Sequence, residues 1–199
     1  MPESRNLPVE FVETRFPVRV ETLGLATDSG GAGAFRGGLG YRKEIRALHD
    51  ATFMSVADRS ILSCWGVRGG RAGTPFRVTI DPGGPAERVM PGLCDWEPVA
   101  AGEVIRIETT GGGGWGDPLT RDPAAVALDV VQGKVSREAA ERDYGVVLAD
   151  GGDLGVRPDA PATATLRARL AAERGDPPMF DRGPGYPRLA GGATGSDVD

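Results

Sequence analysis

Histidine is almost absent from this chain of 199 residues, which contains His49 alone. A metal site that depends on two or three imidazoles cannot be built from a single one, and neither can a zinc cluster of cysteine and histidine ligands. His49 lies in a polar turn at residues 48–50, between two strand patterns. We therefore interpret it as a solvated turn residue rather than the base of a serine triad, and we expect no metal on this chain.

Cysteine is also scarce, with Cys64 and Cys94 only. Two thiols in a chain of this length are too few for a disulfide framework and indicate reduced thiols, so we expect a cytoplasmic protein. Cys64 has no histidine or lysine close to it in the sequence that would activate it. This argues against a role as a nucleophile.

Long apolar runs and basic clusters are missing as well. No run approaches the roughly 18 apolar residues of a membrane-spanning helix, and residues 1–5 do not resemble a signal peptide. The net charge is −5 and the arginines are scattered among acidic residues, unlike a nucleic-acid-binding surface. The Gly-x-x-x-x-Gly-Lys-Ser/Thr phosphate loop is also lacking. We therefore expect this chain alone to bind neither nucleic acid, membrane nor nucleotide.

Glycine and proline are, by contrast, abundant: 31 Gly and 16 Pro make up close to a quarter of the chain. Glycine-rich loops separate runs of β-branched residues throughout residues 8–120, a pattern typical of short strands and many turns. The sequence predicts a mainly β (α+β) fold. It would consist of a β-rich barrel or sandwich with two or three small C-terminal helices and a loose tail.

The strand patterns are short. Residues 9–25 are predicted to be extended. Within residues 39–48, a period of two places Arg42, Glu44 and Arg46 on one face and Tyr41 and Ile45 on the other, as in a half-buried strand. A further run at residues 51–57 follows the turn at 48–50, so these two runs are predicted to form a hairpin. The remaining strand patterns lie at residues 76–80 and 104–109.

Beyond residue 120 the pattern changes to helices. Asp122 before Pro123 is a typical helix start, and Ser136 is a second one. A third helix is predicted at residues 162–173. The predicted divisions are a β-rich glycine-loop domain at 8–120, a small helical extension at 121–150, a linker with the third helix at 151–175, and an irregular tail at 176–199.

The densest glycine loop, residues 110–118, follows a strand pattern and contains four successive glycines, Gly111–Gly114. Glycine tolerates positive φ and allows another group to approach the backbone closely. Trp115 and Asp117 add a contact surface and a charge, so this loop, with Gly113 inside it, is a candidate for facing a ligand or a partner chain. The alternative is a tight connection whose glycines only make room for packing.

Three further places offer candidate substrate- or interface-facing side chains. The pair Asp58–Arg59 could orient a substrate carboxylate or carbonyl, because arginine presents a planar fork of donors; the alternative is a surface ion pair. Trp65 could line a subunit interface, where tryptophan is enriched, or pack in the core. Arg36, beside a glycine pair, could meet a phosphate. None of these residues can be assigned as catalytic from the sequence.

In chain order, several of these segments resemble one family. The segments are Asp28–Gly33, Arg36–Gly40, Asp58–Arg59, Trp65–Gly66, Gly69–Gly70, Gly111–Pro118, Arg121–Pro123 and Asp143–Leu148. Over roughly residues 8–175 the sequence resembles the carboxy-terminal third of the hydantoinase B family. That family provides one large subunit or domain of ATP-dependent N-methylhydantoinases and 5-oxoprolinases, and of the related acetone and acetophenone carboxylases.

The resemblance implies a small subunit, corresponding to the carboxy-terminal part of the B-type component, in a heteromeric ATP-dependent cyclic amidohydrolase of hydantoinase/oxoprolinase type. The implied partners are a hydantoinase A-like ATP-binding subunit and a chain that supplies the amino-terminal part of the B-type component. ATP with Mg²⁺ would bind to partner chains, with a divalent metal there as an open option and no cofactor on this chain. Two alternatives remain open: a subunit of an ATP-dependent ketone carboxylase, and a non-catalytic assembly module.

The sequence departs from the family at two positions. Relatives often have a histidine soon after the Asp-Arg pair and a proline before Trp-Gly, where this chain has Ser60 and Cys64. The resemblance also begins close to Met1, which suggests a natural split subunit or a truncated copy. We therefore expect the isolated chain to be inactive.

Overall fold

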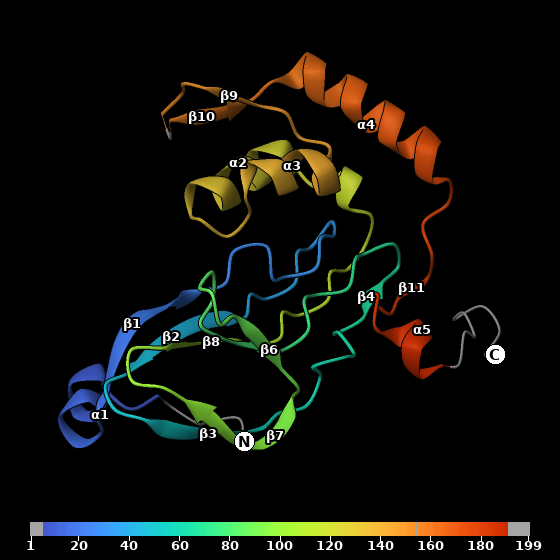
Figure 1. Cartoon of the computed structure of the whole chain (residues 1–199). Coiled ribbons are helices and arrows are strands. Elements are labelled where there is room, and N and C mark those ends of the chain that lie inside the picture. Colours follow the sequence, from blue (N-terminus) through green and yellow to red (C-terminus); the bar gives the residue numbers. More distant parts are fainter. Residues whose placement is uncertain (1–5, 154, 191–199) are drawn as a thin grey trace. The chain divides into compact units, whose positions relative to one another are not determined.

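The structure, a computed structural model, describes residues 6–153 and 155–190 (Figure 1). It is a mixed α+β fold in which the sheets dominate, and no closed barrel forms among these residues. The chain divides into two compact units, each assembled from separate segments. Unit 1 comprises residues 1–24, 41–58 and 77–108, and unit 2 comprises residues 25–40, 59–76 and 109–199.

Unit 1 contains an N-terminal helix that was not predicted from the sequence. Helix α1 (Val9–Arg15) starts after Pro8, so the prediction of an extended chain from residue 9 is wrong for this segment. Its valines and phenylalanine match a strand pattern, but none of its side chains is buried. Local effects therefore decide the conformation: Glu10 in the first turn and Arg15 in the last both complement the helix dipole.

The main sheet of unit 1 has five strands in the order β1-β2-β8-β5-β6. Their bounds are β1 Val18–Leu25, β2 Tyr41–Ala47, β8 Val104–Glu108, β5 Arg77–Ile80 and β6 Arg88–Met90. Strand β8 is antiparallel to both β2 and β5. Charged side chains from β2 pair with β8: Arg42 with Glu108 at 2.7 Å, and Glu44 with Arg106 at 2.6 Å. Arg42 and Glu44 are thus paired with a strand that is far away in the sequence, whereas Arg46 pairs with Glu21 of β1 at 2.7 Å.

A second, two-stranded sheet completes unit 1. Strand β3 (Ala51–Val56) pairs with β7 (Leu93–Val99), antiparallel, with a register shift after Phe53. The buried residues Ala47, Ile80 and Val99 form the core that the two sheets share. Unit 1 is therefore a small sandwich, which matches one of the two predicted architectures.

The predicted hairpin of residues 39–48 and 51–57 does not form. Strand β2 pairs with β8, whereas β3 pairs with β7 in the other sheet. The turn between them contains His49 and Asp50 without a glycine, so it lacks the residues that favour a two-residue hairpin turn. Strand β8 offers β2 apolar pairing across the main sheet, such as Ile45 opposite Ile105.

Unit 2 contains the remaining helices, and the two predicted helix starts are confirmed. Asp122 caps α2 (Pro123–Val131) by accepting from the Ala124 amide at 3.0 Å. Ser136 caps α3 (Arg137–Tyr144) by accepting from the Ala139 amide at 3.0 Å. The other helical elements are η1 Pro118–Thr120, α4 Ala160–Arg174 and α5 Tyr186–Leu189. A two-stranded sheet of β9 (Leu148–Asp150) and β10 (Val156–Pro158) lies between α3 and α4 in the sequence.

Helices α2 and α3 pack on the main core of unit 2. Its buried members are Ala32, Val126, Val135, Ala139, Ala140, Tyr144 and Val146. Burial raises the pKa of Tyr144 to about 12. This core fixes the helical half of unit 2 on the segment around Ala32, which belongs to the glycine-rich loops.

Residues 176–190, here called the strap, are predicted to be irregular but contain two short elements. Strand β11 (Phe180–Asp181) pairs with β4 (Gly66–Val67), and α5 follows it. Both carboxylate oxygens of Asp181 accept backbone amides, from Ala72 at 3.0 Å and Gly183 at 2.9 Å. The strap is therefore held by specific bonds, and residues 191–199 of the predicted tail lie outside the described residues.

Candidate functional site

Three glycine-rich segments of unit 2, residues 29–38, 64–74 and 111–116, hydrogen-bond to one another and are here called the glycine bundle. The Gly31 amide donates to the Gly112 carbonyl at 2.8 Å, and the Gly112 amide donates to the Gly38 carbonyl at 2.8 Å. The Gly114 amide donates to the Arg71 carbonyl at 2.9 Å. Most of these residues do not belong to a regular strand. The backbone itself therefore forms the packing surface here.

Close approach, not unusual backbone angles, explains the four successive glycines. None of Gly111–Gly114 has a positive φ, whereas Gly116 does, at 74°. A Cβ atom at Gly113 would lie 1.8 Å from the carbonyl oxygen of Trp65, and one at Gly111 would lie 1.7 Å from that of Ser29. Neither position can accommodate a side chain without moving the neighbouring backbone. The geometry at Gly113 favours the packing alternative over direct contact with a ligand.

Within the bundle, the side chain of Trp115 presents an aromatic surface. Its backbone bridges to Phe35, and the two rings lie 5.6 Å apart between centroids. The guanidinium of Arg68 lies 5.9 Å from the Trp115 ring. Phe35 is 67% exposed and Trp115 is 46% exposed. This pair is a surface that another molecule could cover.

Asp117 has structural partners on both of its carboxylate oxygens. It caps η1 by accepting from the Leu119 amide at 2.7 Å, and its other oxygen forms an ion pair with Arg174 at the end of α4. Burial acts to raise the pKa of Asp117, but the hydrogen bonds from Arg174 and from the Leu119 amide outweigh it and lower the pKa. Asp117 therefore stays ionised and ties η1 to α4.

Arg36 is buried in an ion-pair network and does not face an open site. Its Nε lies 3.1 Å from a carboxylate oxygen of Asp129, and Arg121 approaches the same oxygen at 2.9 Å. All three side chains are largely buried. Arg36 also donates to the Gly37 carbonyl at 2.6 Å. Because its guanidinium already bonds Asp129 and Gly37, the geometry does not favour the expected contact with a phosphate.

Asp58 and Arg59 are both exposed, and they fall in different compact units. Neither side chain makes an ion pair with another residue of the described chain. Arg59 has a positive φ of 61°, an uncommon conformation for a residue other than glycine, and its carbonyl accepts from the Phe76 amide at 2.9 Å. The structure thus holds the backbone of this pair and leaves its charged groups available.

Trp65 is neither a core residue nor a bare surface residue. Its ring contacts Phe180 and Tyr186 of the strap in edge-on geometry, at centroid distances of 6.1 and 6.5 Å. The guanidinium of Arg182 lies 4.8 Å from the Trp65 centroid and 4.7 Å from that of Tyr186. The interface predicted for Trp65 is thus occupied in part by the chain's own strap.

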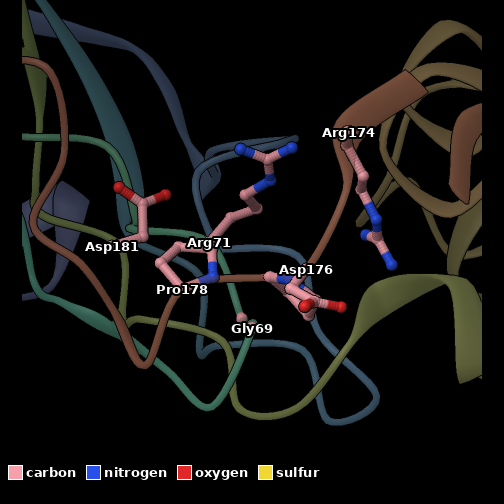
Figure 2. A pocket seen from close by; sticks show the side chains of 8 residues that line it. Gly69, Arg71, Arg174, Asp176, Pro178 and Asp181 are labelled. Carbon is pink, nitrogen blue, oxygen red and sulfur yellow. The ribbon is translucent and has the colours of Figure 1, made fainter. Parts of the chain in front are cut away.

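A pocket of about 90 Å³ lies beside the bundle and the strap (Figure 2). Its lining consists of Gly69, Gly70, Arg71, Arg174, Asp176, Pro177, Pro178 and Asp181. Figure 2 shows Arg71 in the middle of this lining, with Asp181 on one side and Asp176 and Arg174 on the other. Arg71 also lines two neighbouring pockets of about 150 and 240 Å³. Three hollows therefore meet at one side chain.

The chemistry of this site centres on the guanidinium of Arg71. Asp181 and Arg174 are already engaged, whereas no other residue of the described chain bonds to the Arg71 side chain. Its backbone is fixed by bonds to Ala32 and Gly114. An arginine held in this way can bind a carboxylate or phosphate through two parallel hydrogen bonds.

Arg71 is not among the side chains that the sequence singles out. It lies in the segment 69–73, where the glycines attract attention and the arginine is one of many. Its importance depends on the strap, which approaches from more than 100 positions later in the chain, as the bond from Ala72 to Asp181 shows.

Within residues 6–153 and 155–190, no group of three or more His, Cys, Asp or Glu side chains could hold a metal ion. No described helix is long and apolar enough to span a membrane.

Comparison with known proteins identifies the family to which the chain belongs. The family described as Hydantoinase B/oxoprolinase matches residues 1–118. The beta subunit of the caprolactamase of Pseudomonas jessenii is 36% identical over 168 residues, which cover 80% of this chain and 28% of that protein. The B subunit of a putative D-/L-hydantoinase from Pseudomonas sp. is 31% identical over 152 residues, covering 76% of this chain and 26% of that protein.

A solved structure agrees with these sequence matches. Nucleotide-free acetone carboxylase, from a study of ATP-dependent acetone carboxylation, superposes with a TM-score of 0.74 at 25% identity. The superposition covers 98% of this chain and 28% of the acetone carboxylase chain. The chain therefore spans only about a quarter of the length of the relatives it matches.

Proposed function

Because the chain belongs to the hydantoinase B/oxoprolinase family, we propose that it is part of the B-type component of a heteromeric, ATP-dependent cyclic amidohydrolase. The observation that carries this proposal is the family match over more than half of the chain. Relatives named as subunits of a hydantoinase and a caprolactamase support it. Hydantoins and lactams share a cyclic amide, and opening that ring is the reaction class we assign.

In this proposal the labour is divided between chains. A separate A-type polypeptide binds ATP with Mg²⁺ and phosphorylates the ring amide oxygen, which makes the carbonyl carbon a better electrophile. The B-type component, to which this chain contributes together with the rest of the B-type polypeptide, completes ring opening. The presence of a divalent metal on the partner chains belongs to the same proposal.

The residues of this chain take supporting roles in that reaction. We assign Arg71 to the binding of an anionic group, such as the carboxylate that ring opening produces. Phe35 with Trp115, and the free charged groups of Asp58 and Arg59, are assigned to surfaces that face substrate or partner chains. Three further residues, Asp117, Arg36 and Gly113, position these groups through their contacts within unit 2.

An ATP-dependent ketone carboxylase is the second candidate function. The acetone carboxylase structure covers almost the whole chain, which favours it. Sequence identity favours the amide enzymes by a small margin, because it is 36% and 31% for the caprolactamase and hydantoinase subunits and 28% for the alpha subunit of acetone carboxylase. A non-catalytic assembly module is the third candidate.

The test is reconstitution of the complex. The chain is co-expressed with the A-type and B-type polypeptides of its own genome, and the purified complex is assayed with ATP. Ring opening of hydantoin, 5-oxoproline or caprolactam without bicarbonate supports the amidohydrolase. Bicarbonate-dependent carboxylation of a ketone supports the second function instead. A complex that includes this chain but catalyses neither reaction supports the assembly module.

A further inference from the structure

The outer face of the small sheet of unit 1 is apolar and uncovered. Along β3, residues alternate between exposed and partly or fully buried from Thr52 to Val56, so one side of the strand points away from the core. Thr52 lies opposite Pro98, and Val56 lies opposite Leu93 on β7, which places these pairs on one face. The β3–β7 outer face consists of Thr52, Met54, Val56, Leu93, Trp96 and Pro98.

Four apolar side chains of this face are strongly exposed to solvent. Met54, Val56, Leu93 and Trp96 are 63, 80, 69 and 77% exposed, respectively. The opposite side of the same sheet, with Val99 and Phe53, packs on the core of unit 1. Single exposed apolar residues are common, but a contiguous group of this kind marks an interaction surface.

The backbone at Trp96 supports the same conclusion. Trp96 has a positive φ of 57°, which a bulky residue rarely adopts, and it lies in the segment where the β3–β7 register shifts. Irregularities of this type redirect a side chain. Here the redirected indole packs little against its own chain, since it is 77% exposed. The strained backbone at Trp96 is not compensated by packing of the indole within this chain. An exposed tryptophan of this kind is typical of a binding surface.

The charges around the face indicate what can cover it. The segments 50–58 and 91–103 contain five acidic residues but no lysine or arginine. Arg88 of β6 pairs with Glu103 at 2.8 Å and donates to the Pro98 carbonyl, and Glu97 lies opposite Phe53, on the core side of the sheet. Asp50, Asp58 and Asp95 remain, and none of the three forms an ion pair with another described residue. A second copy of the same face would bring like charges together, which disfavours self-association. A partner surface with an apolar centre and a rim of arginine or lysine is complementary.

We propose that the β3–β7 outer face binds the rest of the B-type polypeptide through such a surface. This inference rests on the proposed function. The face lies within the residues that the family matches, and nearly three quarters of the acetone carboxylase chain lies outside the region equivalent to this one. The remaining part of a B-type polypeptide is therefore large enough to cover this apolar face.

The experiment measures the affinity of the full chain for the B-type polypeptide of its own genome. Val56→Arg is compared with Val89→Arg, because Val89 is also an exposed valine on a strand of unit 1 but lies on β6, outside the face. We expect Val56→Arg to weaken binding at least about tenfold and Val89→Arg to change it less than about twofold. Val56→Glu should weaken binding less than Val56→Arg if the partner rim is basic. Thermal unfolding shows that the variants are folded.

Three results would overturn the proposal: equal affinity for wild type and Val56→Arg, equal losses for both arginine variants, or a dimer of this chain that Val56→Arg dissociates. A larger loss with Val56→Glu than with Val56→Arg would also contradict the basic rim. Binding is measured without catalysis, so the two proposals can fail separately. A complex that is sensitive to Val56→Arg but has no ATP-dependent turnover would contradict the proposed function alone. An active complex that is insensitive to this change would contradict the interface alone.

Discussion

At the scale of single residues, backbone contacts in the glycine bundle leave no volume for side chains. We predict that Gly113→Ala destabilises the protein by about 3 kcal/mol, because the added methyl group would overlap the Trp65 carbonyl oxygen. Gly38→Ala is the matched control: Gly38 belongs to the same bundle, has no positive φ, and has open space around its Cβ position. This control should change stability by less than about 0.5 kcal/mol.

Urea unfolding of the two glycine variants provides the measurement. Equal stabilities would show that the backbone relaxes easily around residue 113. Loss of turnover in a Gly113→Ala complex of unchanged stability would restore the ligand-facing interpretation of residues 110–118.

Arg71 is the residue whose replacement should affect function rather than folding. Its guanidinium is exposed and bonds to no other described residue, so Arg71→Ala should leave the unfolding temperature nearly unchanged. In the reconstituted complex we expect KM to rise about tenfold or more, with partial recovery in Arg71→Lys, which keeps the charge but loses the planar fork. Arg169→Ala, at an exposed arginine of α4, is the control. Equal kinetics for Arg71→Ala and Arg169→Ala would remove Arg71 from the site.

Asp117 gives a prediction for pH dependence. Its pKa in the folded protein is lower than its usual value of 3.8, so the unfolded chain binds more protons in the interval between the two values. The stabilisation from this carboxylate is therefore complete above about pH 4 and is lost as the pH falls through the folded-state pKa. Asp117→Asn should cost about 2 kcal/mol at pH 6, and the difference from wild type should shrink toward pH 3. Unfolding free energies at pH 6, 4 and 3 measure it, and a constant difference would contradict the assignment.

At the scale of elements, the sequence predicts helix starts well and strand pairing poorly. The caps of α2 and α3 at Asp122 and Ser136 are confirmed because capping depends on residues within one helical turn. The partner of β2 could not be predicted, because it is chosen by apolar contacts with β8, about 60 residues away. Strand β7 was not predicted because it contains Pro98, and proline within a sheet is confined to edge strands, first strand residues and bulges.

The candidate site shows the same limit. The glycines of residues 111–114 are visible in the sequence, but what they approach, the Trp65 and Ser29 carbonyls, comes from other segments. The role of Arg71, which lines all three pockets, can be recognised only when the strap is seen to line two of the same pockets. Single-sequence patterns therefore locate the loops but not the side chain around which they meet.

The strap offers a test at this scale. Arg182 stacks between Trp65 and Tyr186, so Arg182→Ala should loosen β11 by about 1 kcal/mol. Hydrogen exchange of the Arg68 and Gly69 amides, which donate to strap carbonyls, should accelerate about fivefold.

The control for the strap is Arg188→Ala, since Arg188 is exposed on α5 of the same segment. It should leave the exchange of both amides unchanged. If the two variants accelerate exchange equally, the stacking on Trp65 does not hold the strap.

At the scale of the whole molecule, the chain passes between the two compact units five times. The bundle segments 29–38 and 64–74 are therefore each bounded along the chain by strands of unit 1 on both sides. We predict that the units unfold together: Ile80→Ala, in the unit 1 core, should cost about 3 kcal/mol and lower the unfolding midpoint of both units.

The measurement uses Trp96→Phe as the background, because Trp65 and Trp115 then report on unit 2 alone. Their fluorescence should follow the same denaturation curve as the far-ultraviolet circular dichroism. If Ile80→Ala shifts only the dichroism curve, the units unfold separately.

The glycine bundle also has a consequence for the order of folding. Its hydrogen bonds join residues that are far apart in the chain, such as Gly31 and Gly112, and glycine loses more conformational entropy on ordering than any other residue. Such contacts become favourable only after the strands at the segment ends have paired and shortened the loops to be closed. The bundle is then the last part of the protein to become ordered. Defects within it accelerate unfolding and leave the folding rate almost unchanged.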